Sequence, residues 1–229
     1  EQGGIKAMTG KAGSAELKID DANETHVYLQ LASGESILLR TFTDETEAPA
    51  APWRYLQPID EPVTLQGEWN IRFIAGGPQI PPALVTSTLR SWTEFDQEET
   101  RRFAGTARYR IEFELSEQPA DEWLLDLGDV REAARARLNG EEIGAACCLP
   151  FHIRLGRLTQ QHNVLEIDVT NLAANRIRDM DRRKVPWRVM KEIDIVNIHY
   201  RPFDAAQWAL TPSGLLGPVR MIPMKHIQP

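Results

Sequence analysis

The sequence predicts an all-β protein built as a sandwich of antiparallel sheets. Three observations indicate this fold: apolar and polar residues alternate with a period of two in many short runs, turn-forming residues bound each run, and no long amphipathic helix pattern occurs. In the clearest run, charged residues alternate with four apolar ones: Tyr109, Ile111, Phe113 and Leu115. One face of this strand is therefore expected to be buried and the other solvated, as in an antiparallel sandwich or barrel.

Further runs of the same kind place large apolar residues on one side of their strands. These residues are Trp69, Ile71 and Phe73, then Trp123, Leu125 and Leu127, then Leu165, Ile167 and Val169. We therefore expect Trp69 and Trp123 in the core. The stretch 132–138 also alternates and leads into Asn139-Gly140, a dipeptide whose tolerance of positive φ favours a two-residue hairpin turn.

A change of composition near Trp53 divides the chain. Before it, two short alternating stretches, 27–31 and 37–40, flank a Ser-Gly-Glu-Ser turn and predict a β-hairpin. The acidic, Ala- and Pro-containing segment that leads to Trp53 has no periodicity, which is typical of a linker. Because two or three strands bury little surface alone, we expect residues 1–52 to pack on the sandwich or to be the tail of a preceding domain. Residues 53–229 are expected to form the sandwich itself.

Composition excludes some classes of function. The 229 residues carry a formal net charge of −7, from 33 acidic and 26 basic residues. Nucleic-acid binding requires a concentrated positive surface, so no nucleic-acid partner is expected, whereas neutral sugars impose no such requirement. No run of about 18 apolar residues predicts a membrane span, and no apolar segment behind basic residues predicts a signal peptide. The adjacent Cys147 and Cys148 are poorly placed for a disulfide, and we expect them to be small buried residues.

Seven short motifs follow one another along the second part of the chain. They are Gly67-Glu68-Trp69 and the segments 105–110, 125–130, 137–144, 150–151, 163–171 and 213–219. Their content and order resemble the sugar-binding β-sandwich of family 2 glycoside hydrolases, a galactose-binding-like jelly roll. Together with the preceding stretch that ends near Phe42, the chain is similar to the C-terminal region of large bacterial family 106 α-L-rhamnosidases. The resemblance covers residues 27–223.

The resemblance implies a module that accompanies a separate catalytic domain. Such modules are usually accessory, and a catalytic barrel needs about 250 residues, more than this chain provides. We therefore expect a non-catalytic ancillary domain of an α-L-rhamnosidase-like or β-galactosidase-like enzyme, with an oligosaccharide or polysaccharide and the catalytic domain as partners. The alternatives are a stand-alone carbohydrate-binding module and a glycoside hydrolase active in its own right. The resembling enzymes are exported, so a periplasmic or secreted location is also implied.

Patterns for catalysis and metal binding are weak in this sequence. A glycosidase needs two carboxyl groups across the scissile bond, and the densest acidic cluster, in residues 94–99, is more typical of a solvated loop. The 5 histidines are scattered singly, without the paired spacing of a zinc site, and neither cysteine lies in a catalytic signature. No cofactor is therefore expected. Jelly-roll modules of this kind often hold a structural calcium ion, for which Asp20, Asp21 and Asp129 are nominal ligands.

The segment 171–213 departs from the strand pattern and concentrates Arg, Asp and Trp, with a further strand suggested at 193–200. Long insertions in compact β domains are often functional, and sugar sites combine flat aromatic faces with polar groups. Two tryptophans of this segment, like Trp92 before it, fall in predicted loops. The candidate carbohydrate contacts are Arg178, Asp181, Arg182, Arg183, Trp187, Arg188, His199, Tyr200 and Trp208. Alternatively, these Arg and Asp side chains clamp the segment to the sandwich or dock the catalytic domain.

Overall fold

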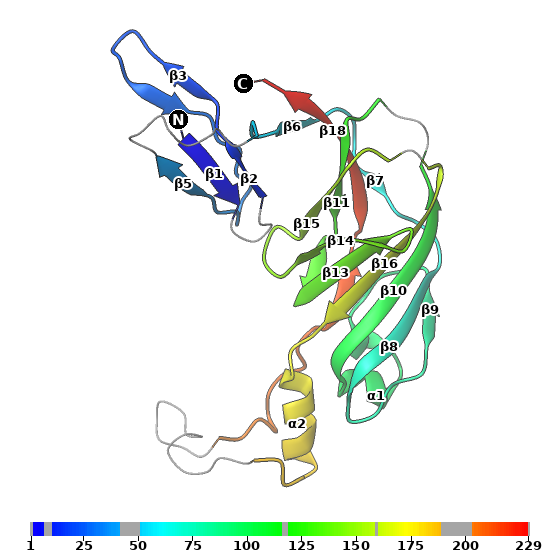
Figure 1. Ribbon diagram of the computed structural model, residues 1–229. Helices are drawn as coiled ribbons and strands as arrows, with labels where there is room; N and C mark the ends of the chain where they lie inside the picture. Colours follow the sequence, from blue (N-terminus) through cyan, green and yellow to red (C-terminus); the bar gives the residue numbers. More distant parts are fainter. Residues whose placement is uncertain are drawn as a thin grey trace.

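The computed structural model describes residues 2–6, 11–41, 51–115, 119–158, 160–188 and 203–228. Figure 1 shows a β-sandwich with a strand-rich N-terminal unit on one side and a helix projecting from one end. The six-stranded sheet contains, in spatial order, β14 (Glu141–Ala146), β13 (Ala133–Leu138), β16 (His162–Thr170), β10 (Ala104–Glu114), β8 (Trp69–Gly77) and β9 (Leu84–Thr86). The predicted all-β sandwich is confirmed.

A five-stranded sheet forms the second layer. Its strands are β15 (His152–Leu155), β11 (Glu122–Asp126), β18 (Arg220–Ile227) and β6 (Tyr55–Pro58), and β7 (Val63–Thr64) also pairs with β18. A short ribbon of β12 (Asp129–Arg131) and β17 (Gly214–Gly217) lies beside these layers. All strand pairs within the two sheets and the ribbon are antiparallel, so each strand can have one buried and one solvated face.

The core lies between the two sheets and consists of the inward residues of each strand. In β10, Tyr109, Ile111 and Phe113 are buried while the charged residues between them are not, which confirms the predicted alternation. Trp69 is 2% exposed and Trp123 is 4% exposed, so both tryptophans occupy the core as predicted. Burial of this apolar surface is the main stabilising contribution to such a fold.

Trp92 also belongs to the core, although the sequence places it in a loop. It begins a short 3-10 turn, η1 (Trp92–Glu94), and its indole Nε1 donates a hydrogen bond of 2.5 Å to the hydroxyl of Tyr109. The same hydroxyl accepts the backbone N–H of Leu215 at 3.0 Å. Burial raises the pKa of Tyr109 far above its ordinary value, and these two donors satisfy the buried oxygen.

The hairpin predicted at Asn139-Gly140 is confirmed, because these two residues join β13 to β14. Their φ angles are 53° and 86°, the positive values that a tight two-residue turn requires. The side chain of Asn139 also accepts the backbone N–H of Val164 at 2.8 Å, which fastens the turn to the neighbouring β16.

Two glycines face each other where β8 and β10 end. Gly76 and Gly105 are register partners with φ angles of 135° and 155°. A Cβ atom at either position would collide with the backbone of the opposite strand, at Ala104 and Ala75 respectively. The close approach of these strands therefore requires glycine at both positions.

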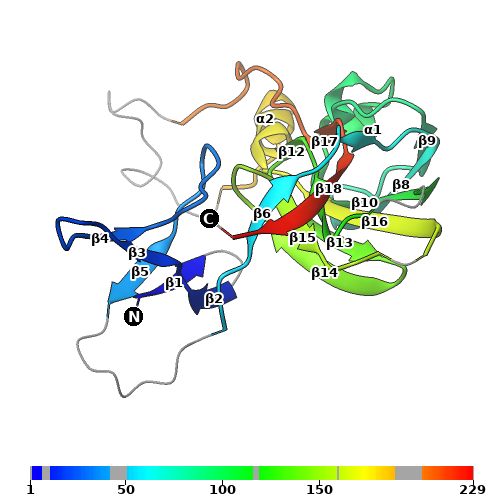
Figure 2. The ribbon, with the colours of Figure 1, turned by 90° about the horizontal axis from the view of Figure 1, so that it is seen from above.

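The N-terminal unit, residues 2–41 as described, consists of two small antiparallel sheets (Figure 2). The first contains β2 (Lys11–Ser14), β1 (Gln2–Lys6) and β5 (Leu38–Thr41), and the second contains β3 (Leu17–Ile19) and β4 (Thr25–Val27). The predicted hairpin between 27–31 and 37–40 is wrong, because β4 pairs with β3 and β5 pairs with β1. A period-two pattern identifies strands but not their partners, and here the stretch after Val27 is held against the sandwich instead.

Polar contacts join the N-terminal unit to β6 of the sandwich. The hydroxyl of Tyr55 accepts the backbone N–H of Glu16 at 2.9 Å and donates to the carbonyl of Tyr28 at 3.0 Å. The side-chain amide of Gln30 bonds both backbone groups of Leu56, at 2.9 and 3.0 Å. These bonds cover part of the outer edge of β6, which would otherwise leave strand groups unpaired.

The described side chains of the N-terminal unit form no buried apolar core. Among residues 13–40, the part of the unit whose side chains are described, no large apolar residue is buried. Ile19 and Leu38 are 65% and 63% exposed. Its strands are therefore stabilised by backbone pairing and by the contacts with β6 rather than by apolar burial.

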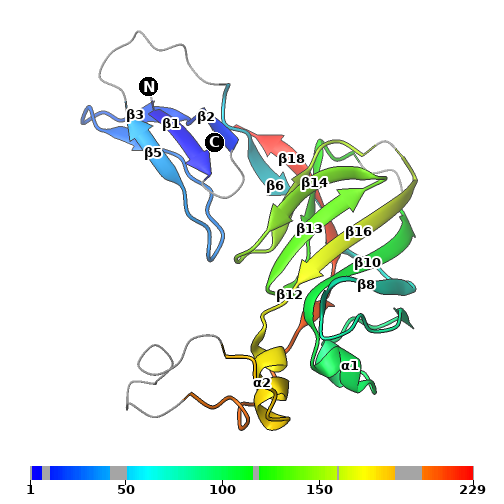
Figure 3. The same cartoon turned by 60° about the horizontal axis from the view of Figure 1, so that its bottom comes forward.

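The described residues include two α-helices that the sequence pattern did not predict. Helix α1 (Glu98–Arg101) contains part of the acidic stretch interpreted as a loop, and α2 (Ala174–Arg182) projects from the sandwich (Figures 1 and 3).

Cys147 and Cys148 are exposed, so the prediction of burial is wrong. They lie directly after the edge strand β14, where no neighbouring strand of the described part of the chain covers them, although cysteine is commonly buried. Within the described residues, no helix has the length and apolar character needed to cross a membrane.

Candidate carbohydrate-contact site

The candidate residues lie on the α2 excursion, which comprises residues 171–188 and 203–213 as described. Figure 3 shows it leaving the sandwich after β16 and returning to β17. At its root, the side chain of Asn171 accepts the backbone N–H of Gly105 at 2.9 Å and donates to the carbonyl of Phe103 at 3.0 Å. The start of the excursion is thereby fixed to the beginning of β10.

Asn175 fastens helix α2 to the returning part of the excursion. Its side-chain amide donates to the carbonyl of Thr211 at 2.7 Å and accepts the backbone N–H of the same residue at 2.8 Å. Asn175 is buried, and the pair of bonds imitates the pairing of two strands. The partner of the amide is thus a residue 36 positions away along the chain.

Asp181 is the polar centre of the excursion. Its carboxylate accepts the indole N–H of Trp187 at 2.7 Å, the Nη2 of Arg188 at 2.9 Å and the backbone N–H of Ala205 at 2.8 Å. The side chain of Asp181 is only 7% exposed. Burial alone raises its pKa, but the bonds from Ala205, Trp187 and Arg188 outweigh burial and hold the pKa below its ordinary value.

Aromatic contacts extend from this centre along the excursion. The guanidinium of Arg188 lies 5.5 Å from the ring centroid of Trp187 and 5.6 Å from that of Phe203. The ring of Phe203 in turn contacts Trp208 edge-on, with centroids 5.4 Å apart. Arg178 donates from Nε to the carbonyl of Trp208 at 2.6 Å. These contacts connect the helix, the segment after it and the returning segment into one cluster.

The structure therefore brings five of the nine candidates together: Arg178, Asp181, Trp187, Arg188 and Trp208. Arg183 lies outside this cluster and pairs with Asp179 at 3.1 Å, and Arg182 is exposed. His199 and Tyr200, with the strand suggested at 193–200, lie outside the described residues. The polar groups of the cluster bind one another, so these contacts stabilise the conformation of the excursion. Trp208 is 42% exposed and remains available as an aromatic surface.

A separate groove lies between residues 28–35 and the sandwich, and we call it the 28–35 groove. Its volume is about 690 Å³. Its lining comes from residues 28–32, Glu35, 53–54, Leu56, Leu124, 143–145, 152–154 and Met224. The groove thus touches both sheets of the sandwich and the N-terminal unit, and no residue chosen from the sequence as a sugar contact lines it.

A buried carboxylate organises the charges beside this groove. Glu122 of β11 accepts Nη2 of Arg154 at 2.9 Å, Nη1 of Arg54 at 3.4 Å and lies 3.0 Å from Nε2 of His226. Burial raises the pKa of Glu122, but the bonds and charges of Arg154 and Arg54 outweigh burial, so its pKa lies below the ordinary value. The carboxylate is therefore ionised at neutral pH and neutralised by its partners.

Two other hollows involve the six-stranded sheet, and the first is also lined by β7 of the five-stranded sheet. One, of about 430 Å³, contains Glu112 and Glu114 together with His162. Both glutamates are exposed and come from the same strand, β10, and Glu112 pairs with Arg110 at 2.6 Å. This arrangement differs from the facing, enclosed carboxyl pair that glycoside hydrolysis requires. The other hollow, of about 340 Å³, lies beside β13 and β14.

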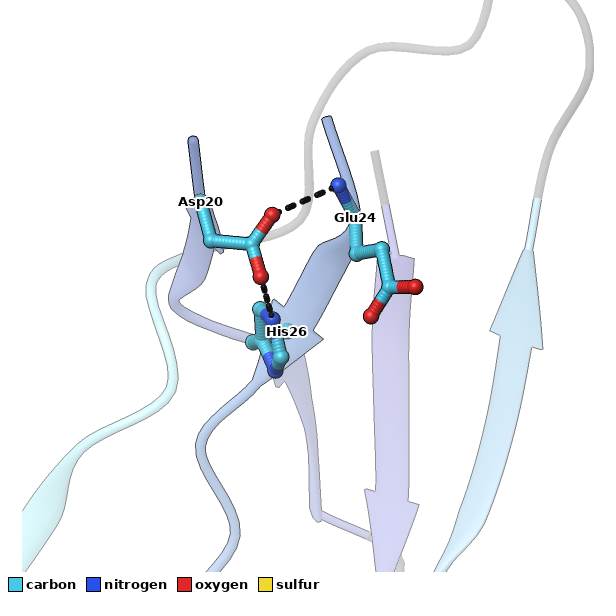
Figure 4. Close-up of side chains that lie close together, drawn as sticks. All are labelled: Asp20, Glu24 and His26. Carbon is cyan, nitrogen blue, oxygen red and sulfur yellow. Dashed lines mark hydrogen bonds and ion pairs between the residues drawn. The ribbon is translucent and has the colours of Figure 1, made fainter. Parts of the chain in front are cut away.

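Three titratable side chains gather at the hairpin of β3 and β4 (Figure 4). Asp20 accepts the backbone N–H groups of Ala22 and Glu24 at 3.0 and 2.8 Å, and its other oxygen lies 2.9 Å from Nε2 of His26. The hydrogen bond with His26, followed by that from Glu24, holds the pKa of Asp20 below its ordinary value. Both oxygens of Asp20 therefore serve the turn.

The nominal calcium ligands do not converge. Asp129 lies in β12, where its carboxylate pairs with Arg131 at 2.7 Å, while Asp20 and Asp21 lie at the hairpin of β3 and β4. These strands belong to different sheets. The three predicted residues therefore do not form one calcium site.

Comparison with known proteins relates the chain to glycoside hydrolases. No protein-family model matches it. A solved rhamnosidase from Novosphingobium sp. PP1Y is 25% identical, with a TM-score of 0.72, over 98% of this chain and 20% of that enzyme. A Formosa agariphila protein that is provisionally named a beta-glucuronidase is 29% identical over 189 residues, which are 71% of this chain and 16% of that protein. A β-glucuronidase from Ruminococcus gnavus aligns with 17% identity and a TM-score of 0.45, over 75% of this chain and 29% of that enzyme.

The chain therefore spans only 20% of the length of the rhamnosidase and 16% of the length of the Formosa protein. The predicted relation to glycoside hydrolases is confirmed at this level. Because the alignment with the rhamnosidase covers 98% of this chain, it includes the N-terminal unit and the α2 excursion as well as the sandwich.

Sequence reasoning missed the residues of the 28–35 groove. A signal for them existed, because Leu29 and Leu31 alternate with polar residues outside the run of sandwich strands. This pattern was assigned to a hairpin, whereas the structure places residues 28–35 against the sandwich without strand pairing. The alternation of Leu29 and Leu31 with polar residues indicated that this segment packs against another part of the molecule. It did not indicate that this part is the sandwich.

Proposed function

We propose that this chain is a non-catalytic ancillary sandwich of a larger glycoside hydrolase, where it packs on the catalytic domain and contacts carbohydrate. The observation that carries the proposal is the alignment of 98% of the chain with only 20% of a rhamnosidase, at a TM-score of 0.72. A region of this size leaves most of such an enzyme to other domains. An α-L-rhamnosidase-like parent fits this similarity, and a β-galactosidase-like parent is the alternative from the sequence motifs.

The carboxylates of the described residues support a non-catalytic role. Glycoside hydrolysis needs one carboxyl group that gives a proton and a second one facing it. The most buried carboxylates, Glu122, Asp168 and Asp181, each bind arginine side chains and have pKa values below the ordinary range. Such groups stay ionised and occupied, which suits structural ion pairs better than acid catalysis.

We assign the packing and glycan contact to the α2 excursion, with the nine candidate residues as its contact set. It projects from the sandwich, carries the exposed ring of Trp208, and displays the exposed Arg182. Its internal contacts keep a fixed shape without help from the core. A rigid projection of this kind suits docking against a neighbouring domain near a bound glycan.

The domain division belongs to the same proposal. Residues 53–229 form a galactose-binding-like jelly roll, and residues 1–52 are a separate segment that packs on it or ends a preceding domain. The polar contacts of Tyr55 and Gln30 and the exposed apolar surface of the N-terminal unit support this division. A periplasmic or secreted location and the absence of a nucleic-acid partner complete the proposal.

Hydrolysis of chromogenic substrates tests the absence of catalysis. The chain is incubated with nitrophenyl α-L-rhamnoside, β-D-galactoside and β-D-glucuronide, and release of nitrophenolate is followed by absorbance. No release above the buffer rate is expected, because no facing acid pair occurs among the described residues. Turnover that disappears on changing one carboxylate would show that the chain is an enzyme in its own right.

Kinetics of the parent enzyme test the role of the α2 excursion. In that enzyme, Arg182→Glu and Trp208→Ala are expected to lower kcat/KM for its glycoside by about tenfold, the effect of losing about 1.4 kcal/mol of contact free energy. Arg135→Glu, on the exposed face of β13, is the matched control and should have no effect. Equal kinetics in all three variants would remove the excursion from the proposal.

A further inference from the structure

We propose that the 28–35 groove binds a neutral pyranoside, with the sugar ring held between residues 28–32 and the sandwich. The inference rests on the proposed function, which makes carbohydrate the expected ligand. It names a different site, because the groove and the α2 excursion lie at different ends of the molecule (Figures 1 and 3).

The dimensions of the groove suit a sugar ring with a small substituent. Its volume of about 690 Å³ falls within the range of roughly 300 to 1,000 Å³ that is typical of small-molecule sites. The edge strands β14 and β15 form one side, and residues 28–32 form the opposite side. Figure 2 shows the N-terminal unit beside β6, and residues of both, together with residues of β15, line the groove.

Apolar side chains face the groove from both sides. Leu29 and Leu31, which are 37% and 49% exposed, line it from the N-terminal unit, and the half-buried Leu124 and Ile143 line it from the sandwich. Trp53 is also one of the lining residues. A pyranose presents a C–H face that can replace water on such a surface, so binding would bury apolar area that stays wet in the free chain.

Hydrogen-bonding groups lie beside these apolar walls. β14 and β15 are edge strands, each paired on one side only, and Gly144 and Ala145 from β14 and Ile153 from β15 are among the residues that line the groove. An edge strand leaves alternate N–H and C=O groups without a strand partner. Sugar hydroxyls both donate and accept, so they match a mixed row of backbone donors and acceptors.

The charges around the groove favour a neutral ligand over a uronate. Arg54 and Arg154 line the groove, but both already bind the buried carboxylate of Glu122. Glu35 adds a carboxylate to the opposite wall. A carboxylate ligand would therefore find the arginines neutralised and a like charge nearby, whereas a neutral ring meets no such opposition.

Titration with two probes of equal aglycone tests the proposal. The chain is titrated with 4-nitrophenyl α-L-rhamnopyranoside and with 4-nitrophenyl β-D-glucuronide, by calorimetry and by the shifts of backbone and indole N–H signals in NMR spectra. The rhamnopyranoside is expected to bind with a Kd in the millimolar range and to shift the signals of Trp53, Gly144 and Ala145. The glucuronide is expected to bind at least about fivefold more weakly, because of its charge.

Two variants and one control locate the binding. Ala145→Trp fills the groove from an exposed position, and Leu31→Asp places a charge on its apolar wall. Each should weaken rhamnopyranoside binding by about tenfold or more, while Val85→Trp should leave it unchanged. Val85 is the matched control because it is exposed on β9, the opposite edge strand of the sheet that contains β14. Near-ultraviolet circular dichroism verifies that all three variants keep the fold.

The outcomes separate this inference from the proposed function. Absence of rhamnopyranoside binding, unchanged binding in both groove variants, or tighter binding of the glucuronide would each overturn the inference and leave the ancillary role standing. Nitrophenolate released in the same samples would overturn the non-catalytic role, while the groove variants would still decide where the glycoside binds.

Discussion

The sandwich and the N-terminal unit are both built of short antiparallel strands, but they are stabilised differently. In the sandwich, inward residues such as Trp69 and Tyr109 form one buried cluster between two sheets. In the N-terminal unit, Leu38 and its neighbours remain exposed, and attachment depends on the hydrogen bonds of Tyr55 and Gln30. Strand pairing and these hydrogen bonds therefore hold the described part of the second region, whereas a facing layer gives the first its stability.

The α2 excursion follows the same rule as the N-terminal unit. Its shape depends on the side-chain bonds of Asp181 and Asn175 rather than on a large apolar face. The molecule thus combines one cooperative core with two projections held by polar bonds. Such projections are expected to open locally at a lower free energy than the sandwich.

The largest effect is expected from removing a core ring. Trp69→Ala should lower the free energy of unfolding by about 3 to 5 kcal/mol, because it leaves a cavity between the sheets in place of a side chain that is 2% exposed. Urea denaturation followed by fluorescence of the remaining tryptophans measures the change. A loss below about 1 kcal/mol would mean that the two regions do not differ as described.

A smaller and local effect is expected at Asp181. Asp181→Asn removes the negative charge that binds Arg188 and should raise amide hydrogen exchange in α2 by about 5- to 30-fold, the effect of about 1 to 2 kcal/mol. The exchange of β10 should not change. Asp179→Asn is the matched control, since its pairs with Arg176 and Arg183 lie within one turn of the same helix and contribute about 0.5 kcal/mol or less each. Faster exchange throughout the sandwich would show that the excursion is part of its cooperative unit.

The pH dependence of stability tests how much a charged cluster on the six-stranded sheet, Asp168 with Arg108 and Arg137, adds to the stability of the sandwich. Burial raises the pKa of Asp168, but hydrogen bonds from Arg108 and Arg137 hold it below its ordinary value. The stabilisation is therefore complete above the unfolded-state pKa of about 3.9 and is lost as the pH falls through the lower folded-state pKa. Asp168→Asn should be less stable than the native chain at about pH 6, with the difference shrinking by about pH 2.

Urea denaturation at several pH values measures this difference. Asp60→Asn, at an exposed aspartate near β6, is the control and should keep the pH profile of the native chain. A difference between Asp168→Asn and the native chain that grows on acidification would contradict the assigned direction of the pKa shift.

The smallest effect is expected in the N-terminal unit. Leu38→Ala should change the free energy of unfolding by less than about 0.5 kcal/mol, because this side chain is 63% exposed. The same urea measurement applies. A loss above about 1 kcal/mol would show that another surface covers Leu38 in solution.

The sandwich was predictable because its signal is local and repeated. Alternation in β10 and the Asn139-Gly140 turn each specify a strand face or a hairpin within a few residues. Strand partners in the N-terminal unit were not predictable, because β1 and β5 meet across more than 30 residues of chain and no residue pattern selects that pairing. Helix α2 gave no signal either, since its buried residue is Asn175 rather than an apolar one.

The role of the candidate residues as a contact site stays a prediction. The concentration of Arg, Asp and Trp singled out the α2 excursion, and in the structure Asp181, Trp187 and Arg188 do meet. What composition could not show is that these groups bind one another. The 28–35 groove was missed for a different reason, because it forms only where two sheet edges and a distant loop converge.

The close approach at Gly76 and Gly105 has a consequence for the far end of the molecule. Gly105 donates its backbone N–H to Asn171, the residue from which the α2 excursion starts. The nine-residue helix α2 is about 13 Å long, so a tilt of about 5° at this base displaces its tip by about 1 Å. The glycine pair therefore fixes the base from which α2 projects: a methyl group added at either position would collide with the facing backbone, so the two strands would have to separate and the base of the helix would move with them.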